Sequence, residues 1–150
     1  MAMNEIGKLW PSLVRIVVAL YWLYFASQKW NGVGWMQSVI KATADANPIP
    51  GLHQFLEQVV VPNWFLFAVL QGAGETVVGV LLLLGIGTRW AAILAVLLAA
   101  NLALTVAFGV NDDGFRWLYW LGLVVSAQVV VSGAGPIAVS RFKWVPAYLR

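Results

Sequence analysis

An acidic side chain lies near the middle of a long apolar segment of this chain. The segment from Asn63 to Gly87, NWFLFAVLQGAGETVVGVLLLLGIG, carries Gln71 and Glu75 one helical turn apart. As a helix rising about 1.5 Å per residue, it is long enough to cross the roughly 30 Å of hydrocarbon in a bilayer. A carboxyl group that faces lipid at this depth costs about 3 kcal/mol or more. Glu75 is therefore expected to face protein, water or a cationic partner.

One face of this helix combines small residues with the two polar ones. At about 100° per residue, the positions that share this face are Ala68, Gln71, Gly72, Glu75 and Gly79. Small residues let a second helix approach closely, and the polar side chains can form hydrogen bonds across the contact. We therefore expect this face to be buried against another helix.

The preceding apolar segment, about Trp10 to Trp30, offers two cations as partners for Glu75. By the same angular count, one of its faces holds Arg15, Ala19, Trp22, Ala26 and Lys29. If the two helices are antiparallel, Arg15 is offset from Glu75 by about 10 Å along the axis, and Lys29 by about 18 Å. A lysine near a helix end also commonly extends to the lipid headgroups. The sequence therefore favours Arg15 as the partner of Glu75.

Several polar side chains are expected inside the membrane. They are Arg15, Gln71, Glu75, Asn101 and Gln128. Such sets line proton or substrate paths, form pockets for ligands such as quinones, or simply hold helices together. A buried carboxyl also tends towards its neutral form unless a cation pairs with it. The residues alone leave these alternatives open.

Composition defines the class of protein and removes several kinds of site. Of the 150 residues, 61% are hydrophobic and 10% are charged, against about 25% charged in soluble domains, so the chain is an integral membrane protein. The net charge of +3 has no basic cluster, which argues against nucleic acid as a partner. The chain has no cysteine and a single histidine, His53, so we expect no intrinsic haem, iron–sulfur cluster or other metal site.

The hydropathy pattern predicts an all-α, four-span transmembrane helix bundle that forms one domain over residues 1–150. The expected spans are about 10–30, 63–87, 88–110 and 115–133. In the first connecting loop, apolar residues recur at helical spacing from Met36 to Thr43 and from Leu52 to Val59. These two stretches predict short amphipathic helices in the interface plane. The Gly- and Pro-rich stretch after the fourth span is expected to fold back along the interface.

The third span carries a ridge of alanines at every fourth position from Ala91 to Ala107. Such a ridge predicts close helix packing. Asn101 lies on roughly the opposite side of this helix, so we expect it to contact either another helix of the bundle or another subunit. Gly122 and Ser126 give the fourth span a second small-residue pair.

Basic residues predict how the chain is oriented. Six lysines and arginines fall on the side that holds both termini, against three on the other side. Cytoplasmic loops carry the excess of Lys and Arg, so both termini are expected to be cytoplasmic in the cell (inner) membrane. Tryptophans cluster at both predicted boundaries, where most of them would anchor the interface.

Several stretches together resemble the DoxX/DoxD family of four-helix membrane proteins. They are Gly74-Glu75 followed by GVLLLLGIGTRWAAILAVLLAA (79–100), the first span from Arg15 to its Lys29 end, and GAGP at 133–136. The loop from Pro48 to Asn63 is more similar to the DoxD branch. After GAGP the family often continues with an arginine and a later aspartate, and this chain has neither over Ile137 to Ser140.

The resemblance implies a membrane subunit of a quinone-linked oxidoreductase, with thiosulfate as the donor in the DoxD branch. Quinone is the cofactor that it implies, and Gln71, Glu75, Trp22 and Gln128 are the candidate binding residues, with Glu75 and Arg15 as candidate catalytic residues. The outer side of the membrane holds three cations against four acids, which does not favour thiosulfate binding by this chain alone, so a partner subunit is expected. The alternative is a non-catalytic accessory subunit of a larger respiratory or photosynthetic membrane complex.

Overall fold

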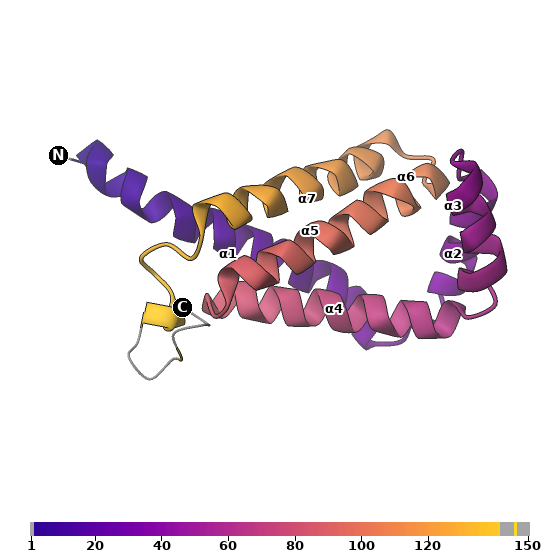
Figure 1. Cartoon of the computed structure of the whole chain (residues 1–150), viewed down its shortest axis with the longest axis horizontal. Coiled ribbons are helices and arrows are strands. Elements are labelled where there is room, and N and C mark those ends of the chain that lie inside the picture. The colour runs from indigo at the N-terminus through magenta and orange to yellow at the C-terminus, as the bar shows by residue number, and fades with distance from the viewer. Residues whose placement is uncertain (1, 142–145, 147–150) are drawn as a thin grey trace.

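The computed structural model describes residues 2–141 and 146, and its main body is a bundle of four long helices (Figure 1). These are α1 (Ala2–Trp30), α4 (Trp64–Leu84), α5 (Thr88–Leu104) and α7 (Asp113–Ser132). The described part of the chain contains no β-strand, which confirms the predicted all-α class. Helix α1 packs along α4 and α5 packs along α7, while α4 with α5 and α1 with α7 close the bundle.

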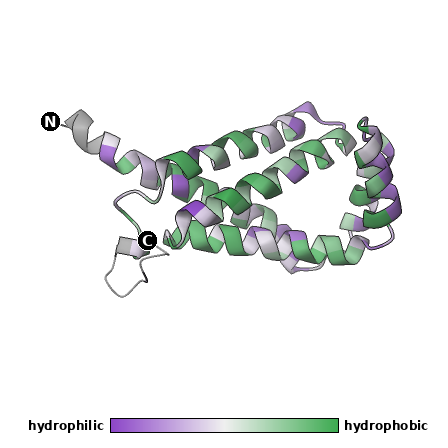
Figure 2. Cartoon of the chain, in the orientation of Figure 1, coloured by the Kyte–Doolittle hydropathy of each residue, from purple (hydrophilic) through white to green (hydrophobic). Residues whose placement is uncertain are grey.

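Four stretches of the bundle are long and apolar enough to span a membrane. They are Gly7–Trp30, Trp64–Leu84, Thr88–Gly109 and Asp113–Ser132. Hydrophobic residues cover these helices, and hydrophilic ones gather towards the ends (Figure 2). Many large apolar side chains face outwards, among them Val131 at 80% exposed and Leu97 at 62% exposed. Outward apolar surface on this scale suits lipid rather than water, so the chain is an integral membrane protein.

Three short elements form a cap across one end of the bundle, on the side away from the start of α1 (Figure 1). They are α2 (Met36–Ala46), α3 (Pro50–Phe55) and the π-helical turn η1 (Leu56–Val60). Ala44, Leu56 and Val60 form a small buried core inside this cap. The Asn47 amide donates to the Leu104 carbonyl at 2.9 Å, which ties the cap to α5. The two predicted amphipathic helices of the first loop are thus confirmed.

Two span boundaries differ from the prediction. Helix α4 ends at Leu84 rather than near 87, because Gly85 adopts a left-handed conformation (φ 71°) that terminates the helix. The third span is broken at Thr105, after which α6 (Val106–Gly109) continues. The Thr105 hydroxyl donates to the Asn101 carbonyl at 2.6 Å, a local bond that competes with the helical ladder.

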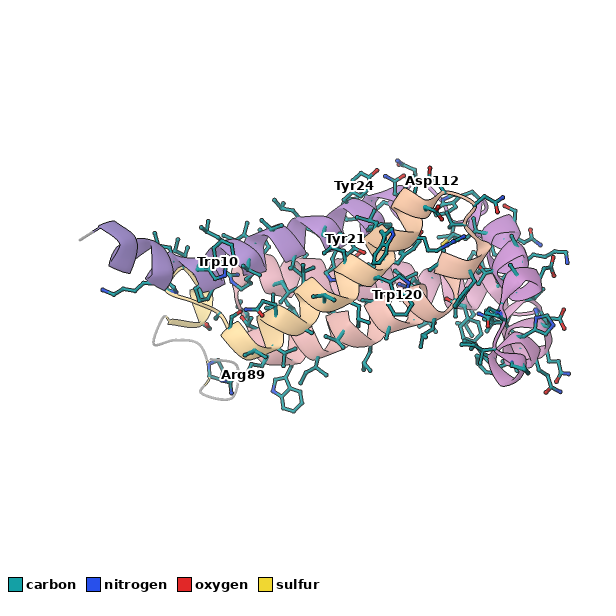
Figure 3. The ribbon with its side chains drawn as sticks, turned by 90° about the horizontal axis from the view of Figure 1, so that it is seen from above. Trp10, Tyr21, Tyr24, Arg89, Asp112 and Trp120 are labelled. Carbon is teal, nitrogen blue, oxygen red and sulfur yellow. The ribbon has the colours of Figure 1, made fainter. Side chains whose placement is uncertain are left out.

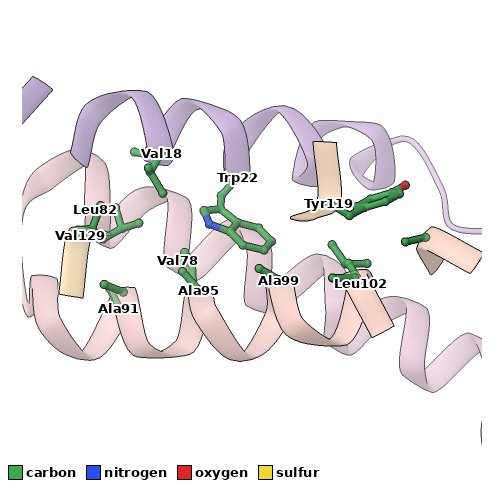
Figure 4. Close-up of a cluster of buried hydrophobic side chains, with 14 residues drawn as sticks. Val18, Trp22, Val78, Leu82, Ala91, Ala95, Ala99, Leu102, Tyr119 and Val129 are labelled. Atoms are coloured by element: carbon green, nitrogen blue, oxygen red, sulfur yellow. The ribbon is translucent and has the colours of Figure 1, made fainter. Parts of the chain in front are cut away.

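Small residues set the distances between helices, as predicted. The alanines at 91, 95, 99, 103 and 107 are all buried, and so are Gly122 and Ser126 of α7. A Cβ atom at Gly79 would lie 2.7 Å from Leu23 Cγ, so α1 and α4 depend on glycine there. The resulting core runs along the bundle axis, with Trp22 filling its middle (Figure 4).

The stretch after α7 turns back over the end of the bundle. Gly133 and Gly135 both have φ of 71°, and a short 3-10 turn, η2 (Val139–Arg141), follows. The Ile137 amide donates to the Ser12 hydroxyl at 3.0 Å, which fastens this segment to α1. The described part of the segment does not span again, and residues 142–145 and 147–150 lie outside the described part of the chain.

Candidate functional site

A cavity of about 250 Å³ lies between the bundle and its cap. Its walls come from α1, α2, α4, α5, α6 and α7, so residues distant in sequence meet there. The lining residues are Tyr24, Phe25, Gln28, Lys29, Trp35, Met36, Val39, Gln71, Glu75, Leu102, Val106, Phe115 and Tyr119. The cavity is therefore mostly apolar and aromatic, with a few polar groups on one side, as is usual for small-ligand sites.

The charged group of this cavity is an ion pair between Lys29 and Glu75. Lys29 Nζ lies 2.7 Å from Glu75 Oε2, and the two side chains are 6% and 0% exposed. The same ammonium donates to the Phe25 carbonyl at 3.2 Å and lies 5.9 Å from the ring centres of Phe25 and Trp35. An ammonium carries three protons, so a third donor position is left for a ligand.

Two amides extend this pair towards the outside of the bundle. Gln71 Nε2 donates to Glu75 Oε1 at 3.0 Å, and Asn101 Nδ2 donates to Gln71 Oε1 at 3.3 Å. Both oxygens of the Glu75 carboxylate are thus engaged, one by a cation and one by an amide. Asn101 thus contacts α4 of the same chain. Of the two contacts expected for it, another helix of the bundle or another subunit, the structure shows the first.

The predicted pairing of Glu75 with Arg15 is wrong, because the assumed alignment of the helices is wrong. That alignment matched the ends of the two spans, whereas Lys29 lies beside Gly72 and Arg15 lies beside Gly85. The first turns of α4 therefore extend beyond the end of α1 and into the cap. Helical side chains also lean towards the N-terminus of their helix, which carries the Lys29 ammonium down to the level of Glu75.

Arg15 instead joins three segments at the far end of the bundle. Its guanidinium donates to the carbonyls of Leu82, Leu83, Ala134 and Ile137, with Nε at 3.0 Å from the Ala134 oxygen. The carbonyls of the last turn of α4 have no partner inside their own helix, so Arg15 acts as its cap. Arg15 is 1% exposed, and these contacts satisfy its buried charge.

The structure does not bring Trp22 or Gln128 to the cavity. Trp22 is fully buried in the core, and its indole Nε1 lies 3.3 Å from the Ser126 hydroxyl, which leaves no surface for a ligand. Gln128 is exposed on α7, roughly 140° round the helix from the centre of the buried face that holds Gly122, Ser126 and Val129. The predicted ligand-binding set is thereby reduced to Gln71 and Glu75.

Several cavity residues were missed by reasoning from sequence. The sequence disfavours Lys29 as the partner of Glu75, and it places Trp35 among the tryptophans that anchor a predicted boundary. Tyr119 lies one turn before Gly122 on the buried face of α7, and Figure 4 shows it at the cavity end of the core. The spacing of Tyr119, Gly122 and Ser126 at i, i+3 and i+7 could have placed this tyrosine on the interior face.

A second, smaller cavity of about 130 Å³ adjoins the first beneath α3 and η1. The two share four wall residues, Met36, Gln71, Leu102 and Val106. The lining of the smaller one is largely aliphatic and aromatic, and Asn101 lies at its wall. Together they form a two-part recess in which the polar groups lie on one side.

Metal-binding side chains do not gather in the part of the chain that the structure describes. No group of three or more His, Cys, Asp or Glu side chains occurs there. His53 lies on the cap, where its Nε2 is 3.4 Å from an oxygen of Glu57 one turn away, and both side chains are partly exposed. This pair belongs to the surface of α3 and η1 and not to the cavity.

Comparison with known proteins places the chain in a family. Searches of curated proteins and of solved structures found no match. The family model of DoxX matches residues 11–108, which include α1 from Pro11 onwards, the cap, α4 and α5. The matched part contains Lys29, Gln71 and Glu75, the polar groups of the cavity. The chain is a member of the DoxX family of membrane proteins.

Proposed function

We propose that this protein is the quinone-binding membrane subunit of an oxidoreductase. The observation that carries the proposal is the buried Lys29–Glu75 pair at the wall of an aromatic cavity within the bundle. Burying two charged groups inside a membrane costs free energy unless they are stabilised by each other or by a ligand. A quinone head is flat, apolar on its faces and polar at its two carbonyl oxygens, and this cavity offers the matching surfaces.

Lys29 is the group that would meet a quinone oxygen. Its ammonium uses one proton on Glu75 and one on the Phe25 carbonyl, and the third can be donated to an oxygen of the head group. The rings of Trp35, Tyr119 and Phe115 line the same cavity and can pack on the flat faces of the ligand. Gln71 holds the Glu75 carboxylate in place from the other side.

Reduction of a quinone to a quinol consumes two electrons and two protons. The chain has no cysteine, and in this proposal a redox-active partner protein supplies both electrons. Lys29 and Glu75 lie where a proton can pass to a reduced oxygen, since each is within hydrogen-bond reach of the other. In this proposal the chain binds and protonates the quinone, and its partner oxidises the substrate.

Charge on the capped end of the bundle supports a partner as the site of substrate oxidation. Lys29, Lys41 and Arg116 are the cations there, and they pair with Glu75, Asp45 and Asp113, respectively. None of these three cations at the capped end is therefore left without an acidic partner, so they do not form a binding site for an anion such as thiosulfate. If the termini are cytoplasmic in the inner membrane, as the positive charges favour, the cap and the cavity lie at the outer surface.

Quinone binding tests the proposal directly. We expect the purified protein in detergent to bind a short-chain naphthoquinone or benzoquinone, measured by titration calorimetry. Glu75→Gln should weaken binding by about tenfold, because the Lys29 ammonium loses the carboxylate that holds it at the cavity wall. Glu57→Gln, an exposed acid on the cap, is the matched control and should bind like the wild type. Equal affinity of Glu75→Gln and wild type would overturn the proposal.

The second candidate is a non-catalytic accessory subunit of a larger complex. The broad outward apolar surface of α5 and α7 suits protein as well as lipid. Purification in a mild detergent distinguishes the two, because an accessory subunit should leave the membrane with a large assembly and bind no quinone alone. Asn101 does not support this candidate, since its side chain donates a hydrogen bond to Gln71 of the same chain rather than to another subunit.

A further inference from the structure

A hollow of about 590 Å³ opens at the other end of the bundle, far from the cap. It lies where α5 begins and α7 ends, and the folded-back segment forms its third side. Its walls are Thr88 and Arg89 of α5, Ser132 of α7, residues 133–135 and Ser140. Figure 3 shows Arg89 near the same end as Trp10, with Asp112 at the opposite end.

The start of α5 has no side-chain cap. The capping position is occupied by Gly87, which has no side chain to accept from the amides of the first turn, and its φ is 55°. The first ladder bond of the helix runs from the Ala91 amide to the Gly87 carbonyl at 3.0 Å. An uncapped helix N-terminus carries partial positive charge and N–H groups that favour an anion.

Two hydroxyl groups beside this helix start have no partner. Thr88 Oγ1 and Ser132 Oγ are both buried, and neither has a hydrogen-bond partner in the structure. Thr88 is 5% exposed and is one of the residues that line the hollow. Because buried hydroxyls are almost always hydrogen-bonded, these two point to a bound group with acceptor oxygens.

The charge of the lining residues indicates that the bound group is negatively charged. Arg89 contributes a guanidinium, whose planar set of donors suits an oxyanion, and none of the described residues that line the hollow is acidic. The hollow therefore combines a cation, a helix N-terminus and two hydroxyl donors. We infer that it binds a phosphate group.

The position of the hollow indicates where the phosphate comes from. Trp90, next to Arg89, is 71% exposed, and Trp10 at the same end is 57% exposed, as expected for tryptophans at the level of the headgroups. Because the hollow lies at the level of the lipid headgroups, the phosphate that it binds is that of an anionic phospholipid. Basic pockets between transmembrane helices bind such headgroups. Free phosphate offers the same chemistry, and the experiment separates the two sources.

Titration of the purified, delipidated protein in detergent tests this inference. The probes are dioctanoyl phosphatidic acid, dioctanoylglycerol, which lacks the phosphate, and inorganic phosphate. We expect the phosphatidic acid to bind at least tenfold more tightly than dioctanoylglycerol, and Arg89→Gln to remove about tenfold of that affinity. Thr88→Val keeps the size of the side chain, removes only its hydroxyl, and should weaken binding severalfold.

Lys41→Gln, an exposed cation on the cap, is the control and should bind like the wild type. Competition by inorganic phosphate at similar affinity would support a phosphate site that takes the free ion, and lack of competition would support the lipid. Equal binding of phosphatidic acid and dioctanoylglycerol would overturn the inference. So would unchanged phosphatidic acid binding in both variants, provided that circular dichroism shows them folded.

Discussion

Lys29 Nζ and Glu75 Oε2 are 2.7 Å apart, although one belongs to the last turn of α1 and the other to the middle of α4. Both side chains are removed from water, so each charge depends on the other for its stability. The pair also joins the two helices at the wall of the cavity. Its energetics and its binding role can therefore be separated by changing one partner or both.

Replacement of Lys29 alone should destabilise the protein strongly. Lys29→Met leaves the Glu75 carboxylate buried and without its cation, which costs about 3–5 kcal/mol in comparable pairs. We expect a large fall in the free energy of unfolding, measured by chemical denaturation in detergent with helical circular dichroism as the signal.

Replacement of both partners provides the control for this prediction. In Lys29→Met/Glu75→Leu no charge is left buried, so most of the lost stability should return. Lys41→Met breaks an exposed pair with Asp45, whose side chains are 68% and 55% exposed, and should change stability by less than about 1 kcal/mol. A double variant no more stable than Lys29→Met would show that the two residues are not energetically coupled.

Much of the helical arrangement could be predicted from the sequence, because local patterns determine it. The spacing of Ala91 to Ala107 and the polar face with Gln71 and Glu75 follow from helix periodicity alone. The structure buries the alanine ridge and that face of α4, on which Gln71 is half-buried. The partner of Glu75 could not be predicted in this way. It depends on how far α1 is shifted along α4, and the shift is set by Gly79 against Leu23 and by the cap that covers the first turns of α4.

Arg15 should stabilise the end of the bundle without affecting the cavity. Arg15→Met removes four donated hydrogen bonds, two to carbonyls at the end of α4 and two to carbonyls of the folded-back segment. We expect a loss of about 3 kcal/mol or more and faster hydrogen exchange in residues 133–137, measured by mass spectrometry.

Arg15→Lys distinguishes charge from geometry at this position. One ammonium cannot reproduce the planar set of donors that reaches both α4 and the folded-back segment, so the lysine should restore little. Affinity for quinone should stay near that of the wild type in either folded variant. Full rescue by lysine would contradict the geometric role.

Gly79 should be intolerant even of alanine. A methyl group there would lie 2.7 Å from Leu23 Cγ and 3.1 Å from the Leu23 backbone nitrogen, so α1 and α4 would have to separate. Overpacking of this kind costs about 1–3 kcal/mol. Gly7→Ala is the control, since no atom lies within 4 Å of its added methyl group. Thermal unfolding in detergent should show a lower midpoint for Gly79→Ala and an equal or higher one for Gly7→Ala.

The two amides outside Glu75 should affect quinone affinity to different degrees. Gln71 bonds Glu75 directly at 3.0 Å, whereas Asn101 reaches it only through Gln71 at 3.3 Å. Gln71→Leu leaves Glu75 Oε1 without its donor and should weaken binding by about tenfold, while Asn101→Leu should weaken it by about threefold. Gln54→Leu, an exposed change on α3, is the control for the added apolar surface. Titration calorimetry measures all three, and an equal or larger effect of Asn101→Leu would show that Gln71 does not position the carboxylate.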